Sequence, residues 1–337
     1  MKDNIKYAVV FAGQGAQKPG MGKSLYEISA AARAVFDLAG EEIKFDCFEA
    51  DAERLKQTEV TQPAVYTMDI AAYMALMEAL GVDKGSFPEP AAVAGFSLGE
   101  YAALTAAGVI ECPEVGLALV RKRALLMKEA GTNPDGSQKG TMAAGMGDPG
   151  AVLALVEKAR GEGVLEAVNF NSPGQTVVAG DMAAVERFAT LAKEDRSLGV
   201  KAIPLPVSGA FHSPLMKPAA EGLAEALEDF SFNAPKYNVY LNVTGGLFED
   251  FSCDCCCGAD ASNDPDKKAK ANFVRQIQSP VQWQKIVEAM KDDGIYTIIE
   301  VGPGKTLSGL VKKIAPELLV LNVEDAESLD ATVSALK

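Results

Sequence analysis

The residues around Ser97 could form an activated nucleophile. Residues 91–96 are an apolar run that predicts a buried strand, and a helical pattern over 98–107 follows at once. Ser97 lies at the join, with Gly95 two residues before it and Gly99 two residues after it. This spacing is typical of a nucleophile elbow, a tight strand-to-helix turn that exposes the serine hydroxyl and needs small flanking residues. The same residues also fit a glycine-rich turn in which the serine only caps the helix.

A serine nucleophile needs a general base, and the chain contains a single histidine, His212, in the loop 208–214. An imidazole titrates close to neutral pH, so we expect His212 to accept the proton of Ser97. A lone histidine in a loop could equally be a surface or structural residue. Its place in the chain also departs from the Ser-Asp-His order of α/β-hydrolases, and no acidic residue stands out as its partner. A backbone carbonyl could orient the imidazole instead.

The elements that must position these two residues alternate between strands and helices. The pattern predicts helices, among them one at 24–39, between strands at 7–12, 91–96, 239–243, 297–301 and 318–323. This alternation predicts a parallel-rich sheet, so we expect an α/β fold with an α/β-hydrolase-like large domain.

A smaller unit interrupts this pattern. Residues 131–140 are turn-rich and read as a linker. Beyond them the pattern predicts, in order, strand, helix, strand, strand, helix and strand, at 141–146, 149–160, 164–169, 175–179, 182–194 and 200–204. This is the order of the ferredoxin-like arrangement. We therefore expect a ferredoxin-like small domain at 138–206, inserted into a large domain made of 1–137 and 207–337.

Composition and charge argue against several classes of partner. Acidic residues outnumber basic ones by 46 to 32, and the formal charge of −14 disfavours nucleic acid. An acidic protein partner would need a local basic patch on this chain. The longest apolar runs fall far short of the ~20 residues of a membrane helix, and the N-terminus shows no export signal. We expect a cytoplasmic protein with no membrane partner.

Two further segments bear on cofactors. The loop 13–17 is glycine-rich but lacks dinucleotide spacing and the Lys-Ser/Thr end of a P-loop, so we expect it to place a backbone N–H opposite the elbow. Cys253, Cys255, Cys256 and Cys257 crowd into one Asp-rich loop without the separated C-x-x-C pairs of a zinc site. We expect no metal and no cofactor, and we expect this cysteine loop to be dispensable.

Five motifs, which follow one another along nearly the whole chain, resemble those of the malonyl-CoA:acyl carrier protein transacylases. These are the malonyl-loading acyltransferases of type II fatty acid synthesis. The motifs are Phe11-Ala12-Gly13-Gln14-Gly15-Ala16-Gln17, Thr61-Gln62-Pro63-Ala64, Gly95-Phe96-Ser97-Leu98-Gly99-Glu100-Tyr101, Asn171-Ser172-Pro173-Gly174-Gln175 and Glu300-Val301-Gly302-Pro303-Gly304. The first has an alanine where many members have proline. The cysteine loop departs from the family and looks like an insertion in a region that varies among its members.

The resemblance implies the machinery of the reaction. Ser97 would be the nucleophile and His212 its base, with the imidazole oriented by a main-chain carbonyl near Gln276. The backbone N–H groups of Gln14 and Leu98 would form the oxyanion hole.

The resemblance also implies three residues that bind substrate. Arg123 would pair with the free carboxylate of the malonyl group, in a two-pronged geometry that lysine cannot copy. Phe211 would narrow the pocket against a methyl group on the α-carbon, and Gln276 would lie beside the substrate. Without the resemblance, an arginine or a glutamine on a helix is usually a solvated surface residue.

The activity implied is ping-pong transfer of a malonyl group from malonyl-CoA to the phosphopantetheine thiol of acyl carrier protein, through a malonyl-serine. A monomeric [acyl-carrier-protein] S-malonyltransferase would thus supply malonyl-acyl carrier protein for fatty acid biosynthesis. Three alternatives stay open. They are a polyketide-type acyltransferase with another acyl-CoA, a thioesterase that uses the same dyad with water, and a noncatalytic scaffold.

Overall fold

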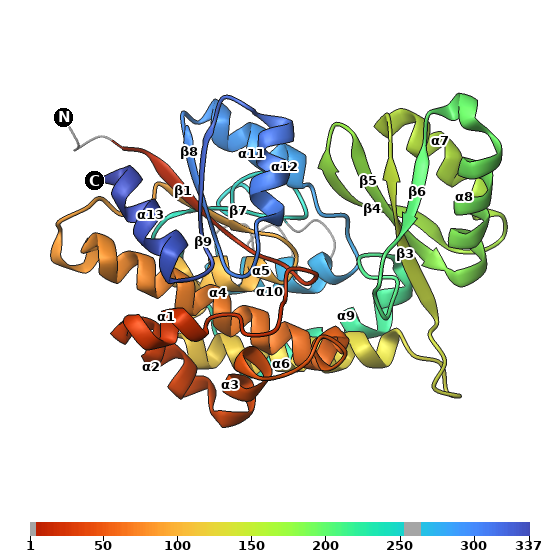
Figure 1. Ribbon diagram of the computed structural model, residues 1–337. Coiled ribbons are helices and arrows are strands. Elements are labelled where there is room, and N and C mark those ends of the chain that lie inside the picture. The colour runs from red at the N-terminus through yellow and green to blue at the C-terminus, as the bar shows by residue number, and fades with distance from the viewer. Residues whose placement is uncertain (1–4, 253–263) are drawn as a thin grey trace.

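The computed structural model describes residues 5–252 and 264–337, whose strands form two separate sheets (Figure 1). The larger body carries a five-stranded sheet and most of the helices. The smaller body, drawn in green, carries a four-stranded sheet and two long helices. The first described strand and the last helix both belong to the larger body, so the smaller one is inserted within it.

The sheet of the larger body is parallel. Its strands are β1 (Tyr7–Phe11), β2 (Ala92–Gly95), β7 (Asn238–Tyr240), β8 (Thr297–Val301) and β9 (Leu319–Val323). They lie in the order β7-β2-β1-β8-β9, and Val9 of β1 is opposite both Val93 of β2 and Ile299 of β8. The predicted parallel sheet is confirmed, and the strand that leads to Ser97 has neighbours on both sides.

Helices cover both faces of this sheet. They are α1 (Lys23–Ile28), α2 (Ala30–Ala39), α3 (Glu41–Phe48), α4 (Thr58–Leu80), α5 (Gly99–Ala106), α6 (Pro113–Ala130), α9 (Lys217–Ala226), α10 (Pro265–Ile277), α11 (Trp283–Asp292), α12 (Thr306–Ile314) and α13 (Ala326–Leu336). Alternate residues of β1 face opposite layers, as a strand requires. Ala8 and Val10 pack with α11 and α12, whereas Val9 and Phe11 pack with the layer that contains α4, α5 and α6.

The smaller body is an antiparallel sheet backed by two helices. Its elements are β3 (Gly140–Met146), α7 (Pro149–Arg160), β4 (Leu165–Ser172), β5 (Gln175–Asp181), α8 (Met182–Glu194) and β6 (Lys201–Pro204). The strands lie in the order β4-β5-β3-β6. Side chains of α7 and α8 pack on one face, while Met142 and Val177 on the other face join the core of the larger body. The predicted fold class is confirmed, and the domain boundaries at 138 and 206 stay a prediction.

One predicted helix is wrong in detail. The stretch 24–39 is two helices, because Ser29 is extended, with φ −108° and ψ 127°, and ends α1. Its side chain accepts the N–H of Ala32 and so caps α2. Within the described ranges, none of the helices combines the length and the apolar character needed to cross a membrane. The cysteine loop lies outside the described residues.

Candidate active site

The turn at Ser97 is closed so tightly that its two glycines have no room for side chains. A Cβ atom on Gly95 would lie 1.9 Å from the carbonyl carbon of Gly99, and one on Gly99 would lie 2.3 Å from the carbonyl oxygen of Phe11. The glycine spacing read from the sequence therefore has a steric cause. The turn joins the end of β2 to the start of α5, as a nucleophile elbow requires.

Backbone strain marks both members of the predicted dyad. Among the residues that the structure describes, Ser97 and His212 are the two non-glycine residues with positive φ, at 52° and 63°. Such a conformation costs of order 1–3 kcal/mol and persists only where the surrounding structure enforces it. Strain of this kind is often found at functional sites.

Ser97 and His212, which are 115 residues apart, meet side chain to side chain. The Oγ atom of Ser97 lies 2.7 Å from Nε2 of His212. The other ring nitrogen, Nδ1, lies 2.9 Å from the backbone oxygen of Gln276. Because a carbonyl can only accept, Nδ1 carries the proton and Nε2 is left to accept the serine hydroxyl proton. A main-chain carbonyl thus stands where other serine enzymes place a carboxylate.

The imidazole is held in its neutral form. His212 is only 4% exposed, and burial, aided by the positive charge of Arg123, lowers its pKa to about 4. At neutral pH the ring is therefore unprotonated and able to act as a base.

Arg123 is a buried cation pointed at the same serine. It is 1% exposed, and its Nη2 atom lies 3.1 Å from Ser97 Oγ and 3.4 Å from Gln276 Oε1. Nη1 donates to Oε1 of Gln62 at 2.6 Å, and the guanidinium lies 5.1 Å from the centre of the Tyr101 ring. In the described part of the chain, these partners are neutral and no carboxylate forms an ion pair with Arg123. A buried guanidinium with neutral partners is suited to bind an anion that arrives with the substrate.

The two predicted oxyanion donors lie on adjoining loops. A Cβ atom on Gly13 would lie 2.5 Å from the carbonyl oxygen of Phe96, so the loop that carries Gln14 touches the elbow. Leu98 directly precedes α5, and the N–H groups at a helix start attract negative charge. In the ranges that are described, neither Gln14 nor Leu98 donates its backbone N–H to another backbone group.

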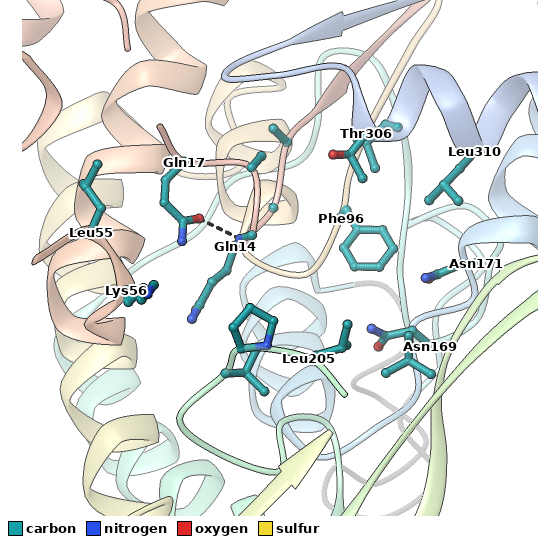
Figure 2. A pocket seen from close by; sticks show the side chains of 18 of the residues that line it. Gln14, Gln17, Leu55, Lys56, Phe96, Asn169, Asn171, Leu205, Thr306 and Leu310 are labelled. Carbon is teal, nitrogen blue, oxygen red and sulfur yellow. Dashed lines mark hydrogen bonds between the residues drawn. The ribbon is translucent and has the colours of Figure 1, made fainter. Parts of the chain in front are cut away.

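Two neighbouring pockets share part of their lining, and Ser97 lines the smaller one. The smaller, of about 90 Å³, is lined by Gln14, Phe96, Ser97, Arg123, Met127, Met142, Asn169, Leu205, Val207, Phe211 and His212. The larger, of about 410 Å³, is shown in Figure 2 and shares Gln14, Phe96, Asn169, Leu205 and Val207 with it. Figure 2 shows Asn169 and Asn171, from the smaller body, on the same side of the larger pocket as Phe96, with Gln14, Gln17 and Lys56 toward the other side. A long narrow ligand could therefore pass between the two bodies and end at the serine.

Of the predicted site residues, Gln14, Ser97, Arg123, Phe211 and His212 line the smaller pocket. Leu98 and Gln276 line neither pocket: Leu98 follows Ser97 in the turn, and the buried Gln276 side chain donates to the backbone oxygen of Ser97 instead of facing the substrate space.

Two partners of these residues were not predicted from the sequence. Gln62 orients Arg123, and Asn242 contacts the elbow backbone on both sides of Phe96. Gln62 lies in a motif noted from the sequence, whereas Asn242 sits in a predicted strand and carries no local signal. Within 5–252 and 264–337, no three His, Cys, Asp or Glu residues are grouped to hold a metal ion.

Comparisons with known proteins agree with one another over nearly the whole chain. Residues 8–330 match the acyl transferase domain family. The malonyl CoA-acyl carrier protein transacylases of Haemophilus influenzae and Bacillus subtilis are each 39% identical to this chain, with 97% and 98% of both chains covered. The crystal structure of an acyl-carrier-protein S-malonyltransferase from Burkholderia pseudomallei superimposes with a TM-score of 0.84 at 38% identity, over 98% of this chain and 100% of the other. A malonyl-transacylase in complex with its type II PKS acyl-carrier protein gives a TM-score of 0.85 at 32% identity, over 98% and 99%.

Proposed function

We propose that this chain, which belongs to the acyl transferase domain family, transfers a malonyl group from malonyl-CoA to the phosphopantetheine thiol of acyl carrier protein. The product would serve fatty acid biosynthesis. The observation that carries the proposal is the environment of one atom, Ser97 Oγ. It lies 2.7 Å from the base His212 and 3.1 Å from the cation Arg123, so a nucleophile, its base and a carboxylate partner are within reach of one substrate.

The first half of the reaction loads the serine. His212 Nε2 takes the hydroxyl proton as Ser97 Oγ attacks the thioester carbonyl, and an Oγ–C bond forms. The N–H groups of Gln14 and Leu98 stabilise the negative charge that develops on the carbonyl oxygen. The tetrahedral intermediate then expels the sulfur of CoA, which leaves as a thiol with the proton from His212. The product is a malonyl-serine ester.

The second half repeats these steps in reverse with a new thiol. The phosphopantetheine thiol of the carrier protein gives its proton to His212 and attacks the ester carbonyl. A C–S bond forms, the Oγ–C bond breaks, and the proton returns to Ser97 from the imidazole. Throughout, the carbonyl of Gln276 keeps the ring in the tautomer that accepts at Nε2.

The larger pocket suits the pantetheine arm that CoA and the carrier protein share. It shares five lining residues with the serine pocket and is lined by residues of both bodies. Asn169 and Asn171 are buried there, and within the described residues their side-chain oxygens accept no hydrogen bond. We expect these side chains to turn toward the amide N–H groups of the arm when it binds, because buried polar atoms in proteins are normally paired.

The substrate class is tested by a transfer assay with holo acyl carrier protein and equal concentrations of malonyl-, methylmalonyl- and acetyl-CoA. We expect mass spectrometry of the carrier protein to show malonyl loading first. Preferred methylmalonyl loading would indicate a polyketide-type enzyme, and acyl groups lost to water would indicate a thioesterase. We also propose that the protein is a monomer and that it acts in the cytoplasm. Analytical sedimentation measures the oligomeric state.

The rate of serine acylation should be insensitive to mild acid. Burial and Arg123 lower the pKa of His212 to about 4, so the base form is present throughout the range from neutrality to about pH 5. Below pH 4 the rate should fall tenfold per pH unit as the imidazole becomes protonated. The measurement is single-turnover acylation across pH, with circular dichroism to confirm folding at each point. A half-loss near pH 6.5, the ordinary value for histidine, would contradict the assigned environment.

Phe211 should restrict branching at the α-carbon of the acyl group. It is 6% exposed and lines the small pocket together with Ser97 and Arg123. One methyl group contributes only ~1–3 kcal/mol of discrimination, so Phe211→Ser should relax the preference for malonyl over methylmalonyl without reversing it. Competition between the two thioesters measures the rate ratio in wild type and variant. An unchanged ratio would remove Phe211 from the specificity site.

A further inference from the structure

We infer that Asn242 is a positioning residue that holds the nucleophile elbow in its reactive geometry. The inference rests on the proposed role of Ser97. Asn242 comes two residues after β7, and β7 pairs with the elbow strand β2, with Val93 opposite Val239. Its side chain therefore lies beside the turn that follows β2, at the shared carboxyl ends of the two strands.

Both ends of the Asn242 side-chain amide bind the elbow. Oδ1 accepts the backbone N–H of Ser97 at 2.6 Å, and Nδ2 donates to the backbone oxygen of Gly95 at 2.6 Å. One planar amide thus bridges the backbone on either side of Phe96. An ionised carboxylate could supply only the acceptor and an aliphatic side chain neither, so the pair of contacts favours an amide at this place.

Asn242 is itself held rigidly. It is fully buried, its backbone N–H donates to Oε2 of Glu100 at 2.5 Å, and its backbone oxygen accepts the N–H of Gln282 at 2.9 Å. Glu100 lies on α5, directly after the elbow, and its other oxygen accepts a hydrogen bond from Asn272 at 2.7 Å. A hydrogen bond therefore links α5, the helix that follows Ser97, to Asn242, the residue that bridges the turn.

This arrangement explains how the strained backbone can serve the reaction. A positive φ at Ser97 is unfavourable by itself, and the two amide contacts favour it by pairing backbone groups that the turn would otherwise leave without partners. Because the N–H of Ser97 is occupied by Asn242, the next N–H, that of Leu98, is the one available to the developing oxyanion.

Asn242 lines neither of the two pockets at the serine, so its removal should change the rate of the chemical step and not substrate binding. We expect Asn242→Ala to slow single-turnover acylation by malonyl-CoA on the order of 10- to 100-fold, since small displacements of reacting groups have effects of that size. The dissociation constant for malonyl-CoA should stay within about twofold. Asn242→Asp is nearly isosteric, and at a pH where its carboxyl group is ionised it should be slow as well, because the carboxylate would face the Gly95 carbonyl; the rate should recover toward low pH, where a protonated carboxyl group can donate to that carbonyl.

Thr332→Val is the matched control. It removes another buried hydrogen bond to the main chain, from Thr332 Oγ1 to the oxygen of Asn322, on α13 and far from the serine along the chain. It should lose stability without losing acylation rate. Thermal unfolding verifies that each variant is folded, and Asn242→Asp carries the test if Asn242→Ala does not fold.

The outcomes separate the inference from the function on which it rests. If wild type forms a malonyl-serine and either Asn242 variant acylates at the wild-type rate, Asn242 does not position the nucleophile. A weakened affinity for malonyl-CoA with an unchanged rate constant would overturn the inference as well. If wild type forms no malonyl-serine at all, it is the proposed function that fails.

Discussion

Replacing Ser97 with alanine is expected to abolish both the malonyl adduct and transfer to acyl carrier protein. The variant keeps the elbow but loses the oxygen that forms the ester, so no other group can complete the first half of the reaction. His212→Ala should slow adduct formation by at least ~100-fold, because positioned general bases contribute about that much. Intact-mass spectrometry after mixing with malonyl-CoA measures both effects.

The matched control for the serine variant is Ser213→Ala. Ser213 adjoins His212 and is fully buried, but its hydroxyl donates to the backbone oxygen of Ala210 and not to the dyad. It should retain adduct formation. A malonyl adduct that persists on Ser97→Ala protein would show that the ester forms elsewhere, and the assigned mechanism would then be wrong.

Arg123→Ala should depress malonyl transfer by two to three orders of magnitude while acetyl transfer is retained or improved. Arg123 is 1% exposed, so in the variant the substrate carboxylate would be left buried without a partner. Loss of one partner from such a pair costs ~2–5 kcal/mol, which corresponds to a rate change of that size. Acetyl-CoA has no carboxylate and should escape the loss.

Two further variants sharpen this prediction. Arg121→Ala removes an exposed arginine two residues earlier on the same helix and should change neither rate. Arg123→Lys keeps the charge but not the planar two-pronged donor, so it should recover only part of the malonyl rate. The measurement is the ratio of acylation rates for malonyl- and acetyl-CoA. If both rates fall together in Arg123→Ala, Arg123 is a structural residue and another group recognises the carboxylate.

Patterns among residues close together in the sequence predicted most of the architecture. Hydrophobic periodicity and the glycine spacing predicted the parallel sheet, the elbow and the six elements of the smaller body, because each depends on residues close together in the chain. The helices α7 and α8 have the predicted bounds, at Pro149–Arg160 and Met182–Glu194. The break at Ser29 was missed because serine is acceptable inside a helix pattern, and only its extended backbone shows that it caps α2.

The contacts that complete the site depend on residues far apart in the sequence. Gln62 meets Arg123 across 61 positions, and Asn242 meets Ser97 across 145. Gln62 lies in a motif noted from the sequence, but the motif does not show which residue it contacts, and Asn242 has no local pattern that distinguishes it from an ordinary polar residue near a strand end. The order of the strands, which places β7 beside β2, had to be known before Asn242 could be placed at the elbow.

The most direct test of the mechanism is the fate of the acyl group on wild-type protein. The enzyme is mixed with malonyl-CoA, freed of excess thioester, and followed by intact-mass spectrometry before and after addition of holo acyl carrier protein. We predict one malonyl group per chain, located on the peptide that contains Ser97, stable in buffer and transferred rapidly to the carrier thiol. A protein that stays unmodified, or an adduct that passes to water as fast as to the carrier protein, would contradict the account.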